Sequence, residues 1–257
     1  MTKALLVYLD QWVFGELLEG RNTGRLEELK RWVGDGEVVC PASMVHVLET
    51  GKRKDHAHRL RLIDLIEELS VGTSVPMMGE PDAMELRAFL DGRSRDWLRR
   101  HLIRSKGLTS QMLGLIRMPG LNLGPHIDSV FERAAATANS RGEDDWVAVR
   151  DRIAKGAGLD PTDLPSAQPE FLATFPTAAT RLALTEAARK DRAPLKRNDI
   201  CDFYSLSVCF PYFDLVTCDP KTERRLRTAQ RMRAAPKSSA RVESNLTALM
   251  GALRRLL

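Results

Sequence analysis

Apolar and polar positions in the first 70 residues predict alternating strands and helices. Residues 4–9 form an unbroken apolar run that ends at Asp10, which is typical of a parallel strand buried on both faces. The next helical patterns place apolar residues three and four positions apart, on one face. We expect one of these helices to begin at Pro41, where its missing N–H costs nothing. The elements predicted after the first strand are helices over 11–19, 25–33, 41–50 and 55–69 and a short strand over 37–40.

The pattern changes between residues 71 and 190, where no run is convincing as a strand. Several helical stretches occur there, and prolines and glycines separate them. We therefore expect an all-helical insertion over residues 71–194. This insertion would divide a core that is made of residues 1–70 and 195–257.

Strand and helix patterns return near residue 198. The apolar run from Phe213 to Cys218 predicts another buried strand, and it is followed by Asp219. Strands that alternate with helices in this way predict an α/β fold with a short parallel sheet. The other elements predicted in this part are helices over 198–210, 220–233 and 244–257 and a short strand near 241–242.

The composition is that of an ordinary globular protein. The 257 residues are 43% hydrophobic and 28% charged, which excludes a disordered or collagen-like chain. The longest apolar runs are too short to span a bilayer, and the N-terminal residues lack the pattern of a signal peptide, so we expect a cytoplasmic protein. The four cysteines form no CxxC pair and are expected to be reduced and mostly buried.

The positive charge is concentrated in the last quarter of the chain. Residues 191–257 carry 13 Lys and Arg against 7 Asp and Glu, whereas residues 1–190 carry 26 against 27. Such a distribution favours a polyanionic partner, and nucleic acid above all. The basic segment over 221–233 directly follows Asp219, and a second basic segment covers 87–106. Either segment could bind phosphates or be a solvated helix face.

Five acidic residues have positions that suggest a shared site. Asp10 and Asp219 follow predicted parallel strands, and ligands of open α/β sheets bind beyond the carboxyl ends of the strands. Glu49 and Asp202 lie on predicted helices, with Asp199 three residues before Asp202 on the same face. The alternative is that these acids are helix caps, first-turn residues that suit the helix dipole, or part of a solvated face.

If these carboxylates converge, a cation is needed, because like charges at short range raise one another's pKa. Magnesium prefers oxygen ligands and is commonly held by a few carboxylates and a substrate phosphate. Such a site activates water and neutralises charge on a phosphodiester. His46, three residues before Glu49, could orient Glu49 or contact a substrate phosphate, or it could be bonded to nearby backbone. No GxSxG, GxGxxG or GxxxxGK[ST] motif is present, which argues against serine hydrolases and nucleotide-binding enzymes.

Three segments together resemble the PIN-domain nucleases. The segments are LLVYLDQWVF, CPASMVHVLET and NDICDFYSLSVCFPYFDLVTCD, and the second resembles the Pro-x-Ser-x-x-His-x-x-Glu-Thr block of one PIN-like subgroup. The resemblance covers residues 1–70 and 195–257, about half the chain. In the third segment we expect a helix, a Pro-Tyr turn and then a strand. The chain departs from many PIN domains at Gln11 and Trp12, where they have a small polar residue followed by Asn or Ser.

The resemblance implies a three-layer α/β/α sandwich and phosphodiester hydrolysis that depends on Mg²⁺ or Mn²⁺, usually of RNA, with 5′-phosphate products. It also implies an acid quartet, which consists of Asp10, Glu49, Asp202 and Asp219, and it makes Asp199 a further metal ligand candidate. Many relatives are toxins or defence effectors, so an antitoxin or guard protein is a potential partner, and a homo-oligomer is a further option.

We accordingly expect an endoribonuclease in which Asp10, Asp202 and Asp219 hold the metal and Glu49 holds it through water or acts as a base. The residues expected to bind substrate are His46, Lys221, Arg224 and Arg225. Two alternatives stay open. One is a catalytically weak module that binds nucleic acid, and the other is a scaffold whose insertion docks a protein.

Overall fold

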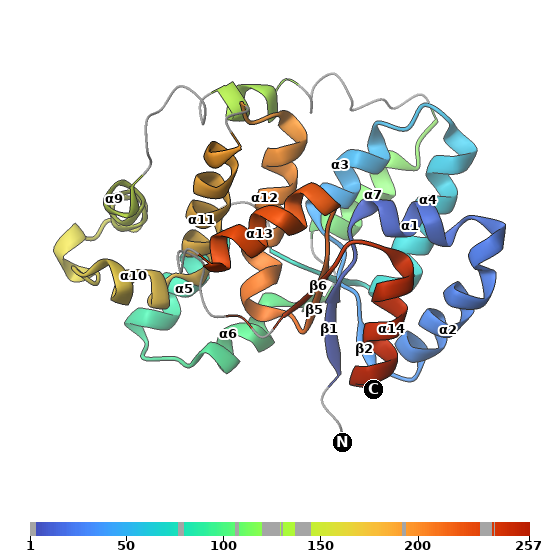
Figure 1. Cartoon of the computed structure of the whole chain (residues 1–257), viewed down its shortest axis with the longest axis horizontal. Coiled ribbons are helices and arrows are strands. Elements are labelled where there is room, and N and C mark those ends of the chain that lie inside the picture. The colour runs from blue at the N-terminus through green and yellow to red at the C-terminus, as the bar shows by residue number, and fades with distance from the viewer. Residues whose placement is uncertain are drawn as a thin grey trace.

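A computed structural model describes residues 4–76, 80–105, 108–119, 129, 131–136, 145–191, 194–231, 238 and 240–257. The described chain is a mixed α/β structure that consists mostly of helices (Figure 1). Within it, no helix is long and apolar enough to cross a membrane. All four cysteines are buried and unpaired, as expected.

The sheet has four parallel strands in the order β2-β1-β5-β6. The central strand β1 pairs with β2 through Leu5 and Val38, and with β5 through Val7 and Leu215. The beginning and the end of the chain therefore share one sheet, which confirms the predicted α/β class with a short parallel sheet. The strand bounds are β1 (Leu5–Tyr8), β2 (Val38–Val39), β5 (Leu215–Thr217) and β6 (Arg241–Glu243).

Helices cover both faces of this sheet, because successive side chains of a buried strand point to opposite sides. Val7 and Leu9 belong to one hydrophobic cluster, whereas Tyr8 belongs to another. The helices that contribute to the first cluster are α1 (Gln11–Leu17), α2 (Thr23–Gly34), α3 (Met44–Gly51), α4 (His56–Ser70), α7 (Leu108–Ile116) and α14 (Leu246–Leu256). The helices packed together on the opposite side are α11 (Pro176–Lys190), α12 (Arg197–Tyr212) and α13 (Pro220–Arg231).

The prediction of an all-helical insertion was wrong in one respect. Two-residue strands β3 (Thr73–Ser74) and β4 (Arg104–Ser105) pair in antiparallel fashion, and Ser74 also bridges to Ala42 beside the main sheet. Strands of two residues are too short to show an alternating pattern in a sequence. The other elements whose bounds the structure defines between residues 71 and 175 are α5 (Glu80–Leu90), α6 (Arg95–Leu102), α7 (Leu108–Ile116), α9 (Trp146–Gly156), a 3₁₀ turn (Pro161–Asp163) and α10 (Gln168–Thr174).

Two predicted helix ends near the acids were also wrong. Helix α3 begins at Met44 rather than at Pro41, because the side chain of Ser43 caps it by accepting from the His46 N–H. Helix α12 continues through Pro211, so the expected Pro-Tyr turn is its last turn. The end of the helix is closed by a bond from the Phe213 N–H to the Cys209 carbonyl at 2.9 Å.

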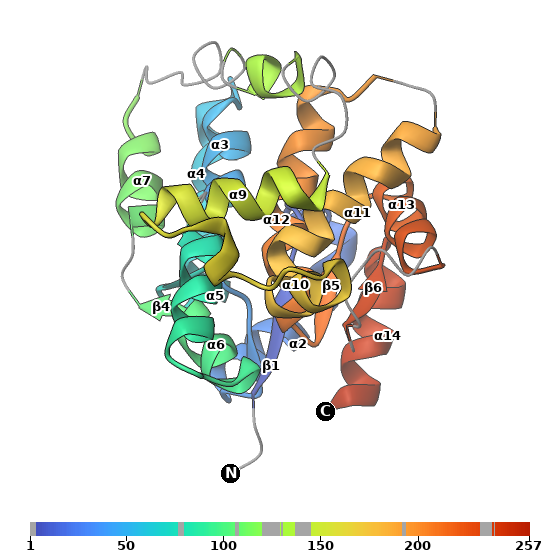
Figure 2. The same cartoon turned by 90° about the vertical axis from the view of Figure 1, so that its left-hand side faces the viewer.

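The segment between the two core parts is joined to the core by α11, which packs on α12 and α13. Figure 2 shows α9 and α10 in front of α11 and α12. Residues of α5, α9 and α10 belong to a separate small hydrophobic cluster. The buried side chain of Glu85 on α5 connects these layers. Its Oε1 accepts from the Thr177 N–H of α11 at 2.9 Å and from the Tyr212 hydroxyl of α12 at 2.5 Å.

Candidate functional site

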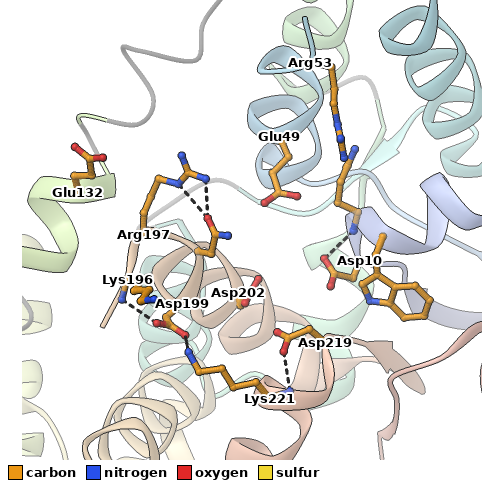
Figure 3. A pocket seen from close by; sticks show the side chains of 13 residues that line it. Asp10, Glu49, Arg53, Glu132, Lys196, Arg197, Asp199, Asp202, Asp219 and Lys221 are labelled. Carbon is orange, nitrogen blue, oxygen red and sulfur yellow. Dashed lines mark hydrogen bonds and ion pairs between the residues drawn. The ribbon is translucent and has the colours of Figure 1, made fainter. Parts of the chain in front are cut away.

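The residues that follow β1 and β5 line a pocket of about 690 Å³. The structure brings the four predicted acids together there, although they are far apart along the chain. In Figure 3 their carboxyl groups turn toward one common space. The acidic lining residues are Asp10, Glu49, Glu132, Asp199, Asp202 and Asp219, and the basic ones are Arg53, Lys196, Arg197 and Lys221.

Asp10 is fixed at the end of β1 by hydrogen bonds with Gln11 and with Thr217 of β5. Its Oδ1 accepts from the Gln11 N–H at 2.7 Å, so Asp10 caps α1. This confirms the alternative interpretation of Asp10 as a helix cap. Its own N–H donates to Thr217 Oγ1 at 2.6 Å, and that hydroxyl donates to the Tyr8 carbonyl at 3.1 Å. Asp10 is therefore a helix cap and a lining residue of the pocket at the same time.

Asp219 and Asp202 meet at the hydroxyl of Thr222. Asp219 Oδ1 accepts from the N–H groups of Lys221 and Thr222, which fixes its carboxylate at the start of α13. Thr222 Oγ1 lies 2.5 Å from Asp219 Oδ2 and 3.3 Å from Asp202 Oδ2. A hydroxyl has one hydrogen to donate, so one of these two carboxylates is always left without it.

Burial raises the pKa of three acids in this pocket, and repulsion between carboxylates adds to the rise for two of them. The pKa of Asp202 rises to about 9 through burial and the charges of Asp10, Asp219 and Glu49. Burial and the charge of Glu49 raise the pKa of Asp10 to about 7. Burial also raises the pKa of Glu49, and the nearby charges of Lys52, Arg53 and Arg197 oppose this rise. The protein thus holds several carboxylates where they compete for protons.

Asp199 differs from these acids because cations and an N–H group surround it. Its Oδ1 accepts from Lys221 Nζ at 2.8 Å and from Arg225, and its Oδ2 accepts from the Lys196 N–H at 2.8 Å. Burial opposes ionisation, but these bonds hold the pKa of Asp199 below its ordinary value. Asp199 is therefore the counter-ion of Lys221 and Arg225 in this arrangement.

The predicted substrate-binding residues of α13 have three different environments. Lys221 lines the pocket, while Arg224 is exposed and does not line it. Arg225 is only 1% exposed; it bonds to Asp191 and Asp199 and lies over the ring of Phe203. The Arg225 side chain thus contacts protein groups rather than the pocket.

His46 also lies inside the protein, where it is 1% exposed. Its Nδ1 accepts from the Ser43 N–H at 3.0 Å, so Nε2 carries the proton and donates to the Leu9 carbonyl at 2.7 Å. Burial lowers the pKa of His46 to about 4, so the ring is neutral near pH 7. In this arrangement His46 makes no contact with the pocket, as the interpretation of a histidine bonded to backbone predicted.

Sequence reasoning missed several of the lining residues. Arg53 lies just beyond the end of α3, four positions after Glu49, and a cation so near in the sequence was a usable signal. Lys196 and Arg197 directly precede the third PIN-like segment, and their charges could have been noted. Glu132 gave no signal, because it falls in the segment whose place relative to the core the sequence does not define.

The donor set fits a hard divalent cation by its chemistry. Carboxylate oxygens are the preferred ligands of such ions, and a cation would relieve the repulsion that raises the pKa of Asp10 and Asp202. Within the described ranges, however, no three His, Cys, Asp or Glu side chains stand close enough together to form a closed metal site. Binding therefore requires the carboxyl groups to draw closer around the ion.

Comparison of the chain with models of known protein families, with curated proteins and with solved structures gave no match. The resemblance to PIN domains therefore rests on the three sequence segments. The function has to be argued from the pocket and from the fold that forms it.

Proposed function

We propose that this protein is a metal-dependent nuclease with a PIN-like three-layer fold, and that it cleaves RNA internally with Mg²⁺ or Mn²⁺. One observation carries the proposal: four acids from four separate segments line one pocket. Burial raises the pKa of three of them, and repulsion adds to the rise for Asp10 and Asp202. The parallel order β2-β1-β5-β6 and the helices on both faces support the fold assignment.

A purely structural role does not account for these acids. Carboxylates that repel one another in a half-buried pocket destabilise the fold, unless a cation is present. Asp199, which does have a structural role, is paired with cations, whereas the pKa of Asp202 and Asp10 is raised. Strongly shifted acids that line a pocket are typical of functional sites.

Each acid can be given a role in hydrolysis. Asp10, Asp202 and Asp219 would hold the divalent ion, which supplies charge neutralisation and makes a bound water more acidic. Glu49 would hold the ion through water or accept the proton of the attacking water, for which its raised pKa is suited. Lys221, oriented by Asp199 at 2.8 Å, would contact a phosphate oxygen.

The basic lining residues support a polymeric substrate. In Figure 3, Arg53 lies on the α3 side of the carboxylates, and Lys196 and Lys221 lie on the side of α12 and α13. Cations on both sides can bind phosphates that precede and follow the scissile bond. This arrangement favours cleavage within a strand over removal of a terminal nucleotide.

The test is cleavage of end-labelled single-stranded RNA and DNA in the presence of Mn²⁺ or Mg²⁺. We expect the wild type to cleave RNA internally and Asp219→Asn to lose at least about 100-fold in rate, since a metal ligand and its charge are removed. Glu27→Gln is the matched control, because Glu27 is an exposed acid on α2 outside the pocket. Equal rates for the wild type and Asp219→Asn would refute the proposal.

A second function, binding of nucleic acid without cleavage, is favoured by one observation. Among the residues the structure describes, the acids do not form a closed three-ligand metal group. This alternative predicts that the wild type binds RNA without cutting it and that Asp219→Asn binds equally well. A toxin or defence role with an antitoxin partner stays a prediction of the family resemblance, as does a cytoplasmic location.

A further inference from the structure

Two buried hydrogen bonds connect the end of β1 with helix α3. His46 Nε2 donates to the Leu9 carbonyl at 2.7 Å, and Gln11 Nε2 donates to Thr50 Oγ1 at 2.9 Å. Leu9 and Gln11 are the neighbours of Asp10 in the chain. Likewise, His46 lies one helical turn before Glu49, and Thr50 directly follows it. The two bonds therefore flank both acids of the pocket.

All three side chains in these bonds are almost fully buried. His46 is 1% exposed, Gln11 4% and Thr50 0%. In such surroundings a hydrogen bond is strong, and its loss leaves a buried polar group without a partner.

The ring of His46 is held from several sides. It stacks on Tyr8 with ring centroids 5.5 Å apart, and Phe14 meets it edge-on at 5.0 Å. Its Nδ1 also accepts from the Ser43 N–H. The donor Nε2 therefore has one direction available, and that direction is the Leu9 carbonyl.

Packing alone does not explain a glutamine at position 11. The apolar residues Leu9, Val13 and Val47 already join β1, α1 and α3 in one cluster. Gln11 adds a buried Oε1 that has no hydrogen-bond partner among the described residues. A leucine would avoid this cost, so the polar contacts of Gln11, which also lines the pocket, explain the residue, and the bond to Thr50 is the contact that its side chain makes.

We propose that His46, Gln11 and Thr50 are positioning residues, which form a brace that holds Asp10 and Glu49 at a fixed separation so that both can act on one ion. The inference rests on the proposed nuclease function. Apolar contacts between a strand and a helix permit small sliding movements, whereas hydrogen bonds on both sides of each acid fix their register.

The first test compares Thr50→Val with Thr50→Ser. Valine keeps the shape of threonine but removes the acceptor of the Gln11 bond, whereas serine keeps the hydroxyl. By calorimetric titration with Mn²⁺ alone, we expect Thr50→Val to bind about 10-fold more weakly than the wild type and Thr50→Ser to bind nearly as well. With RNA, Thr50→Val should lower kcat by a similar factor and leave KM almost unchanged, because the basic lining residues are not altered.

The second test separates the two nitrogens of His46. In His46→Asn the amide takes the place of Nδ1, so the bond to Ser43 is kept and the bond to Leu9 is lost. In His46→Gln the amide reaches the position of Nε2, and the bond to Leu9 is kept. We expect His46→Gln to bind Mn²⁺ more tightly than His46→Asn and to have the higher kcat, even if the two variants have the same Tm.

These outcomes distinguish failure of the brace from failure of the proposed function. A wild type that binds Mn²⁺ and cleaves RNA, with Thr50→Val unchanged and His46→Asn equal to His46→Gln, would overturn the brace alone. A wild type that neither binds Mn²⁺ nor cleaves RNA would overturn both. If Thr50→Val does not fold, the two His46 variants decide the question.

Discussion

Glu85 leads to a prediction about how stability depends on pH. This carboxyl group lies between α5, α11 and α12 and is 1% exposed. Burial raises its pKa to about 8, although bonds with Thr177 and Tyr212 favour the ionised form; the nearby charge of Asp82 adds to the rise. Since Glu85 Oε2 has no partner among the described residues, ionisation would place an incompletely solvated charge in the interior.

The sign follows from the two states of the protein. Below pH 4.5, the ordinary pKa of a glutamate, Glu85 is protonated in both the folded and the unfolded chain. Between pH 4.5 and about 8 only the unfolded chain releases the proton, so the free energy of unfolding falls as the pH rises. At 1.36 kcal/mol per pKa unit, the whole loss is about 5 kcal/mol.

The assay is urea unfolding of the wild type and Glu85→Gln at several pH values from 5 to 8.5. Glutamine keeps an oxygen that accepts from the Thr177 N–H and the Tyr212 hydroxyl, but it does not titrate. We expect the stability of the wild type relative to Glu85→Gln to decrease by several kcal/mol across this range. The acids of the pocket titrate equally in both proteins and cancel in the difference. Two curves that stay parallel from pH 5 to 8.5 would refute the reasoning.

Three further predictions concern the metal, the substrate and the packing of α13. Mn²⁺ at 100 times its dissociation constant should stabilise the wild type by about 2.7 kcal/mol, which is measured as a higher Tm than in EDTA. A similar increase in the Tm of Asp219→Asn would contradict a metal site at Asp219. Arg53→Ala should weaken RNA binding and reduce the slope of log K against log salt concentration by about 1, whereas Arg224→Ala, which changes a residue outside the pocket, should change neither. Anisotropy titrations at several salt concentrations measure both quantities. Equal effects of the two substitutions would argue against an RNA strand bound in the pocket. Arg225→Met should lower the free energy of unfolding by about 3 kcal/mol, because the buried Asp199 loses one of its cationic partners. Urea unfolding measures this change, and a value below about 0.5 kcal/mol would be inconsistent with the pairing.

The sheet and the acids could be predicted because both leave local signals. Buried parallel strands are continuous apolar runs, and Asp10 and Asp219 stand directly after two of them. The pairing of β1 with β5 then places both acids at one edge, whatever the intervening chain does.

The environment of each basic residue could not be predicted in the same way. Arg224 and Arg225 are neighbours in the sequence, yet one is exposed and the other is buried against Asp191 and Asp199. The difference depends on how α13 is rotated against α11 and α12, which is a property of tertiary packing. The interior position of His46 likewise depends on the Leu9 carbonyl, 37 residues away.

The adjacency of β1 and β5 has a consequence for the newly synthesised protein. Strand β5 and Asp219 are translated more than 200 residues after Asp10. A nascent or prematurely terminated polypeptide therefore lacks half of the acidic pocket. A cell that makes this protein would be protected from the proposed cleavage activity until Asp219 has been translated.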